Sequence, residues 1–280
     1  MPSQFNNSRN IFFWVLLVAS LGLFYTYHIP LRDKSLPFML AWQKAHPVET
    51  EPFELALADW LEGFTGTERY YQMCFMLFPF VSRPRFFYLL LGFVSCDVVK
   101  NIIKLGYHMP RPLWLWSDLQ CYAAEKTFAN PSGHTARASF ITVFLLLDFF
   151  FASDYARETN PKTNKRSFRK DKLAACILLV AGLCYLFGLA YLVFVTGNHT
   201  MDQLLLGLQF GLWLSFYLHF CWRDLIYDHI SFITNVPTLK TEKAFSNMLI
   251  GSLIWGTAVL MIFSEMFYLY YFWDPEQSWI

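Results

Sequence analysis

The stretch LAACILLVAGLCYLFGLAYLVFVT, residues 173–196, decides the fold of this chain. It contains no charged side chain, and about 20 mostly apolar residues are enough to cross the hydrocarbon core of a bilayer. A short polar connection then leads into a second apolar run, residues 202–221. The two runs predict a pair of consecutive membrane-spanning helices.

Further runs of the same kind lie on both sides of this pair. These predicted spans cover residues 11–27, 85–105, 135–153 and 244–272. A seventh, 70–82, is short, but Arg83-Pro84-Arg85 directly after it is typical of a tight charged turn between antiparallel helices. The first run lacks a small-residue cleavage site, so we expect it to be a retained span and not a removed signal peptide.

The composition agrees with a membrane protein. Hydrophobic residues make up 55% of the 280 residues and charged residues only 15%, and the formal net charge is +1. This balance gives no indication of a nucleic-acid partner. Most of the cysteines lie in or beside apolar runs and form no pattern of a disulfide framework. We therefore expect an all-α transmembrane helix bundle with about seven spans.

The distribution of positive charge predicts the orientation in the membrane. Thirteen lysines and arginines lie in the segments on the same side as the 154–172 loop, and six lie in those on the opposite side. Cytoplasmic loops are enriched in lysine and arginine, so the 154–172 loop is expected to be cytoplasmic. Its basic run is either this topology signal or a binding site for anionic lipid. On the opposite side, the apolar spacing of residues 53–61 fits either an interfacial amphipathic helix or a simple loop helix.

Polar residues gather where the predicted spans reach the non-cytoplasmic surface. Asp97, Lys100 and Lys104 are three and four residues apart and share one helix face. They either support one another or are lysines that reach from the span to the interface. Arg111 follows between two prolines, which restrict the backbone on both sides of it. Two cations held so close together favour an anionic ligand.

Two more polar stretches are expected on the same surface. The first is Asn130-Pro131-Ser132-Gly133-His134, whose amides, hydroxyl and imidazole at a helix start suit a phosphate, although the same pattern also serves as a helix cap. The second covers residues 197–203. There His199 and Asp202 are three apart, so the carboxylate could orient the imidazole as a nucleophile or base. A purely structural pair has the same spacing.

In their order, these stretches resemble the motifs of the type 2 phosphatidic acid phosphatase superfamily. The first motif, Lys-x6-Arg-Pro, is matched by Lys104, Arg111 and Pro112. The second, Pro-Ser-Gly-His, is matched by residues 131–134. The aromatic residues after Arg111, followed by Cys121 and Glu125, are more similar to the glucose-6-phosphatase branch.

The third motif of that superfamily, Ser-Arg-x5-His-x3-Asp, is matched in part. His199 is present, but Leu192 and Val193 stand where serine and arginine belong. Asp202 lies three residues after the histidine, and Gln203 occupies the aspartate position at four.

The resemblance implies a phosphatase that needs no metal or other cofactor. His199 would attack phosphorus, His134 would protonate the leaving oxygen and then activate water, and Asp202 would orient His199. The phosphoryl oxygens would be held by Lys104, Arg111, Ser132 and Gly133. Because valine cannot replace the bidentate grip of an arginine, we hypothesise that Arg137, one turn beyond His134, takes over from position 193.

The resemblance further implies three parts. Residues 1–69 hold the first span and an interfacial segment, 70–221 form a six-helix phosphatase-like core, and 222–280 hold a cytoplasmic loop and the last span. The expected substrate is a phosphomonoester or diphosphate, either a lipid phosphate or a sugar phosphate, hydrolysed on the lumenal, periplasmic or extracellular face. A catalytically impaired protein that binds phosphate or lipid, or acts as a scaffold, is the alternative. A channel or transporter is disfavoured because the ionisable residues gather at one surface.

Overall fold

The computed structural model of the protein describes residues 7–46, 83–107, 109–116, 118–119, 128–159 and 168–223, together with residues 72, 76, 226, 256 and 260. The helices in this part are α1 (Asn7–Ala45), α4 (Arg83–Tyr107), α5 (Pro112–Leu115), α6 (Gly133–Thr159), α7 (Phe168–Val195), α8 (Met201–Tyr217) and the π-helix η2 (Leu218–Trp222). The described residues include no strand. The predicted all-α class is confirmed.

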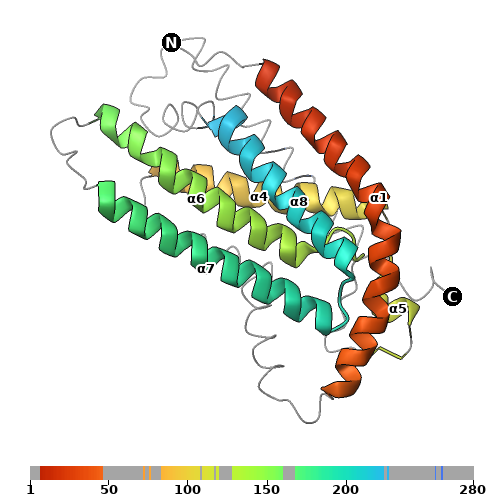
Figure 1. The fold of residues 1–280 in the computed structure, drawn as a ribbon. Helices are drawn as coiled ribbons and strands as arrows, with labels where there is room; N and C mark the ends of the chain where they lie inside the picture. The colour runs from red at the N-terminus through yellow and green to blue at the C-terminus, as the bar shows by residue number, and fades with distance from the viewer. Residues whose placement is uncertain are drawn as a thin grey trace.

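The helices form a bundle around α6, which packs against α4, α7 and α8 (Figure 1). α1 lies along α8 on the other side. In Figure 1, α6, α7 and α8 are seen nearly side by side, while α1 runs down the edge of the bundle and bends partway along. The side chains of the core between α4, α6 and α8 are mostly aromatic or leucine, and Phe93, Phe140 and Phe144 are among the most deeply buried.

Four of the described helices are long and apolar enough to cross a membrane. They are Ser8–Ala45, Arg85–Lys104, Leu173–Val195 and Met201–Trp222. They agree with the spans predicted at 11–27, 85–105, 173–196 and 202–221, and the span predicted at 135–153 is helical within α6. The helix predicted at 53–61, and all but single residues of the spans predicted at 70–82 and 244–272, lie outside the described residues.

α1 is longer than the hydropathy pattern predicts. It continues past residue 27 through Pro30 and Pro37 to Ala45. A proline inside a helix removes one backbone hydrogen bond and bends the axis, which accounts for the bend in Figure 1. The second half stays helical because it packs on the bundle: Met39 is fully buried in an apolar cluster with residues of α7. Tertiary packing therefore extends the helix beyond its membrane-spanning sequence.

α6 and α8 approach each other closely at two glycines of α8. A Cβ atom on Gly207 would lie 2.6 Å from the carbonyl oxygen of Ser132, and one on Gly211 would overlap the carbonyl oxygen of Ala136. Small residues four apart allow two helix backbones to touch in this way. The contact fixes the first turns of α6 against α8, and these turns carry the second motif.

Candidate active site

The three polar stretches predicted from the sequence meet at one end of the bundle. The first and second are joined by Ala129 N, which donates to the carbonyl oxygen of Met109 at 3.0 Å. The second and third are joined by Ser132 N, which donates to the carbonyl oxygen of Gln203 at 3.1 Å. The first and third are joined by Gln203 Nε2, which donates to the carbonyl oxygen of Pro110 at 3.3 Å. Segments far apart in the sequence thus form one polar surface.

Gln203 is a site residue whose role the sequence did not reveal. Besides contacting Pro110, its side-chain Oε1 accepts a hydrogen bond from the backbone N–H of Thr200 at 3.1 Å. This contact closes the first turn of α8, in the manner of a Thr-x-x-Gln capping box. The residue that replaces the family aspartate therefore holds the first and third motif stretches together. The capping pattern itself is a signal that could have identified it.

His134 and His199 lie next to each other. Their ring centroids are 5.8 Å apart, and both side chains are buried. His134 is the second residue of α6, while His199 lies in the turn between α7 and α8. That turn includes Gly197 with φ of 79°, a left-handed conformation that costs other residues about 1–2 kcal/mol. The glycine, two residues before the histidine, lets the chain turn after α7 ends at Val195.

Arg111 lies directly beside His199. Its side chain is fully buried, and Nη1 lies 3.5 Å from His199 Nε2 and donates to the carbonyl oxygen of Asn198 at 3.4 Å. Pro112 begins α5 immediately after it and fixes the backbone there. Positive charge is therefore placed next to the Nε2 atom of His199.

Two lysines of α4 face the start of α6. A Cβ atom on Gly133 would lie 3.8 Å from the Nζ atoms of both Lys100 and Lys104. Ser132, just before it, is buried, and its Oγ accepts a hydrogen bond from Thr135 N at 3.5 Å. The serine thus caps α6, while the glycine leaves room for the two ammonium groups.

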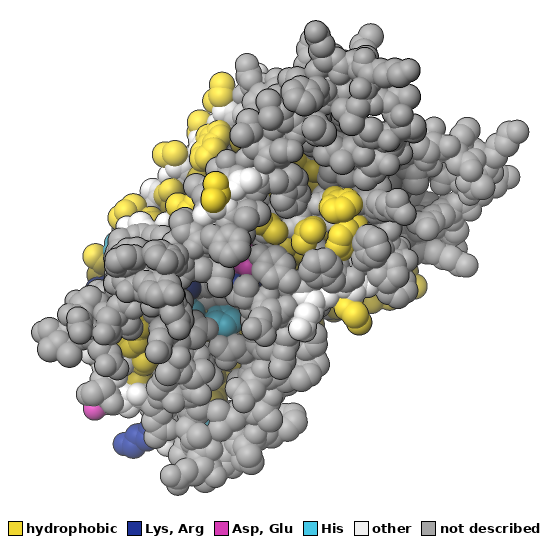
Figure 2. All heavy atoms as spheres, turned by 180° about the vertical axis from the view of Figure 1, so that it is seen from behind, with side chains coloured by type: hydrophobic (Ala, Val, Ile, Leu, Met, Phe, Trp, Pro, Cys, Tyr) yellow, Lys and Arg dark blue, Asp and Glu magenta, His cyan; other side chains and the backbone are white. Residues whose placement is uncertain are grey.

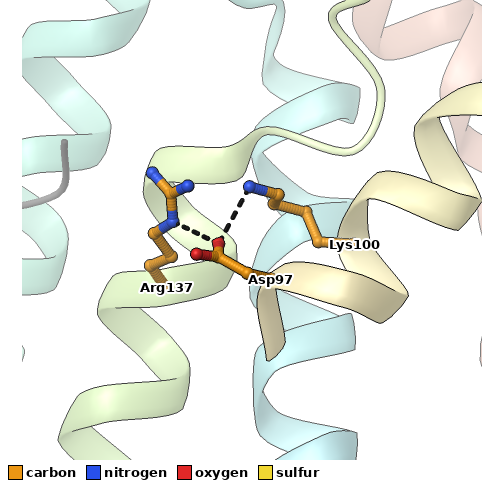
Figure 3. Close-up of polar contacts among 3 residues, drawn as sticks. All are labelled: Asp97, Lys100 and Arg137. Carbon is orange, nitrogen blue, oxygen red and sulfur yellow. Dashed lines mark hydrogen bonds and ion pairs between the residues drawn. The ribbon is translucent and has the colours of Figure 1, made fainter. Parts of the chain in front are cut away.

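Arg137 is held by an acidic residue of α4. Asp97 Oδ1 accepts a hydrogen bond from Arg137 Nε at 2.7 Å and a second from Lys100 Nζ at 3.0 Å (Figure 3). All three side chains are buried. Of the predicted support among Asp97, Lys100 and Lys104, the structure shows the contact between Asp97 and Lys100, and Asp97 also binds Arg137 of α6. On the face shown in Figure 2, histidine, basic and acidic side chains come to the surface close together.

The structure shows no hydrogen bond between the Asp202 carboxylate and His199 among the described residues. Asp202 is fully buried, and its charge interacts with Tyr27 and Arg32 of α1. The orientation of His199 by Asp202 stays a prediction.

Val193 lies in an apolar cluster and not in the polar site. Its side chain is 3% exposed and packs in the cluster that contains Met39, Ala138 and Leu189. A valine suits these neighbours, which explains how the chain accommodates the departure from the third motif.

Among the residues that the structure describes, no group of three or more histidine, cysteine, aspartate or glutamate side chains could hold a metal ion. The family model of the PAP2 superfamily matches residues 85–227, a stretch from α4 past η2 that contains the first two motifs and His199 of the third. This match confirms the resemblance to the superfamily, and the similarity to the glucose-6-phosphatase branch stays a prediction. Comparison with curated proteins gave no match, and comparison with solved structures gave none either.

Proposed function

We propose a hydrolytic function for this chain, which belongs to the PAP2 superfamily. Membership makes it a membrane protein of the phosphatase type. The proposed reaction is hydrolysis of a phosphomonoester or diphosphate, carried by a lipid or a sugar, through a phosphohistidine intermediate. The observation that supports it best is the position of the Arg111 guanidinium, 3.5 Å from His199 Nε2. The His134 ring lies beside the His199 ring at the same site.

In the first step, His199 Nε2 attacks phosphorus and forms an N–P bond. The bond from phosphorus to the leaving oxygen breaks, and its electron pair stays on that oxygen. His134 donates a proton to the leaving oxygen, so the departing group leaves as a neutral alcohol or as the lower phosphate. Because Arg111 lies beside Nε2, it can bind a phosphoryl oxygen at the moment of attack.

In the second step, water attacks the phosphohistidine. His134, now neutral, takes a proton from the water as the O–P bond forms and the N–P bond breaks. Inorganic phosphate leaves and His199 returns to its starting state. His134 is again protonated, so both histidines are ready for another cycle.

The phosphoryl oxygens are held by groups around the start of α6. Lys104, Arg111 and Arg137 supply positive charge, and the Ser132 hydroxyl and Gly133 amide supply hydrogen bonds. Arg137 is the proposed replacement for the arginine that position 193 lacks. Support comes from its buried place on α6, where Asp97 fixes its Nε atom.

The test is phosphate release by the purified full-length protein from a diacylglycerol phosphate, an isoprenoid diphosphate and a hexose phosphate. We expect release from at least one of them, abolished in His199→Ala. A histidine on α1 provides the control: His28→Ala should keep wild-type activity, because His28 contacts Tyr25 and Phe24 on its own helix. In a rapid-quench experiment with labelled substrate, we expect acid-labile, base-stable label on the wild-type protein and none on His199→Ala.

A phosphate-binding protein without turnover is the second candidate. The observation that favours it is Val193, which leaves the third motif without its arginine and packs in an apolar cluster. Phosphate binding without release from any substrate of the panel would decide for this candidate and against the enzyme.

A further inference from the structure

Lys100 has the same relation to the phosphoryl site as the motif lysine Lys104. The two Nζ atoms lie at an equal 3.8 Å from the position of a Cβ on Gly133. The Lys100 stem also runs against this glycine, since its Cδ atom lies 3.4 Å from the same position. Lys104 matches the first motif, whereas Lys100, one helical turn earlier, matches no motif position. The geometry nevertheless brings both ammonium groups to the start of α6.

Burial argues against the simpler explanation that Lys100 reaches out to the membrane interface. A lysine that extends from a membrane span to water exposes its ammonium group. The Lys100 side chain is 5% exposed, and its Nζ atom points to a carboxylate within the bundle. Keeping an ammonium group buried is costly, so the position calls for a compensating role.

Asp97 supplies part of that compensation in a specific way. A single oxygen, Oδ1, accepts hydrogen bonds from Lys100 on its own helix and from Arg137 on α6. Both cations therefore lie within hydrogen-bond distance of one point, despite their mutual repulsion. In Figure 3 the ammonium and guanidinium groups lie on either side of this oxygen, near the first turn of α6.

We infer that Lys100 is a second phosphate-binding lysine and that Asp97 is the positioning residue that holds Lys100 and Arg137 toward the phosphoryl group. This inference rests on the proposed function, because it concerns the same site. Helix α4 then supplies two lysines that bind the substrate, Lys100 and Lys104. It also supplies one carboxylate, that of Asp97, which does not contact the substrate. Lys100 and Arg137, both held by Asp97, together replace the single arginine that position 193 lacks.

The experiment measures binding of inorganic phosphate to the full-length protein in detergent by calorimetry, so it requires no turnover. In Lys100→Met the loss of one charge-assisted hydrogen bond should raise the Kd for phosphate by about tenfold to a hundredfold. Lys44→Met is the matched control, since Lys44 is an exposed lysine at the end of α1. Its Kd should stay at the wild-type value.

In Asp97→Asn, the direction of the change in the Kd for phosphate distinguishes between two roles of Asp97. If Asp97 acted only through its charge, its removal would tighten the binding of an anion. If it positions Lys100 and Arg137, the two cations separate and the Kd rises, by about tenfold. Asp97→Glu, which keeps the carboxylate, should recover part of the affinity.

The inference is overturned if folded Lys100→Met has an unchanged Kd for phosphate, or if Asp97→Asn binds phosphate more tightly. It is also overturned if the wild-type protein does not bind phosphate. If Lys100→Met does not fold, the sign of the Asp97→Asn effect decides. The proposed function fails separately: phosphate binding that depends on Lys100, without release from any substrate, would leave this inference standing and remove the hydrolase. Conversely, if His199→Ala abolishes phosphate release but Lys100→Met leaves the Kd for phosphate unchanged, the proposed function stands and this inference fails.

Discussion

At the scale of single residues, positions 137 and 193 show how the site departs from its family pattern. Val193 is buried among apolar neighbours, so a cation there would have to leave an apolar cluster to reach the substrate. Arg137 already lies at the start of α6, and its Nε atom is bonded to Asp97. A guanidinium held in this way still presents its Nη groups in a fixed plane, the geometry that suits a phosphoryl group.

Arg137→Ala is therefore expected to lower kcat for phosphate release by about 10²–10³, the typical loss when one transition-state stabiliser is removed. Arg137→Lys should retain an intermediate activity, because it keeps the charge but not the fork. Restoring the family residue with Val193→Arg should not raise activity, and it should lower the melting temperature by burying a charge among apolar side chains. Unchanged kcat in Arg137→Ala, or a gain in Val193→Arg, would show that Arg137 does not replace the missing arginine.

At the scale of elements, the packing of α6 on α8 sets the distance between the two histidines. Gly207 faces the backbone where α6 begins, and the Thr135 hydroxyl donates to the carbonyl oxygen of Leu204 at 3.0 Å. His134 lies in the first turn of α6, and His199 precedes α8. A change in the separation of the helices must therefore change the separation of the histidines.

Gly207→Ala is expected to destabilise the protein by about 1–3 kcal/mol, because the added methyl overlaps the start of α6 and forces a backbone shift. Phosphate release should fall as well. Gly188→Ala on α7 is the matched control: a Cβ there meets no atom within 4 Å, so the variant should be neutral or up to about 1 kcal/mol more stable. Thermal unfolding and phosphate release of both variants check this. Equal behaviour of the two variants would contradict the role assigned to the glycine contact.

The sequence predicted the positions of the helices better than the contacts between them. Hydropathy located the spans at 85–105, 173–196 and 202–221 because apolar length is a local property. It missed the second half of α1, whose helix depends on packing against α7. The motif spacing located His134, His199 and Arg111, but the bond between Asp97 and Arg137 joins two helices and has no local signature.

At the scale of the whole molecule, α1 runs antiparallel to α8 and connects the two ends of the bundle. Near its start, the carbonyl oxygen of Phe13 accepts a hydrogen bond from Trp213 Nε1 at 2.7 Å. Near its end, Gln43 Nε2 donates to the carbonyl oxygen of Val195 at 3.2 Å, close to the site. Its 39 residues extend over about 58 Å, nearly twice the roughly 30 Å of a hydrocarbon core. We infer that the end of α1 beside the site projects from the membrane.

The charge pattern predicts that this end lies on the non-cytoplasmic side. In a variant without its native cysteines, Lys44→Cys should react with a membrane-impermeant maleimide added outside intact, sealed membranes that expose the non-cytoplasmic face. Ser8→Cys, at the other end of α1, should react only after the membrane is opened. Val180→Cys, on the exposed apolar face of α7, should not react in either case. Reaction of Ser8→Cys alone from outside would place the candidate site on the cytoplasmic face.

The amide of Gln203 limits how this protein can be engineered. Its Nε2 is the donor that Pro110 requires, and its Oε1 is the acceptor that Thr200 requires. A carboxylate at 203 could serve only the second of these contacts. Reverting position 203 to the consensus aspartate would thus loosen the turn that carries Arg111. An aspartate at 203 would therefore have to be introduced together with changes in the loop around Pro110, and not alone.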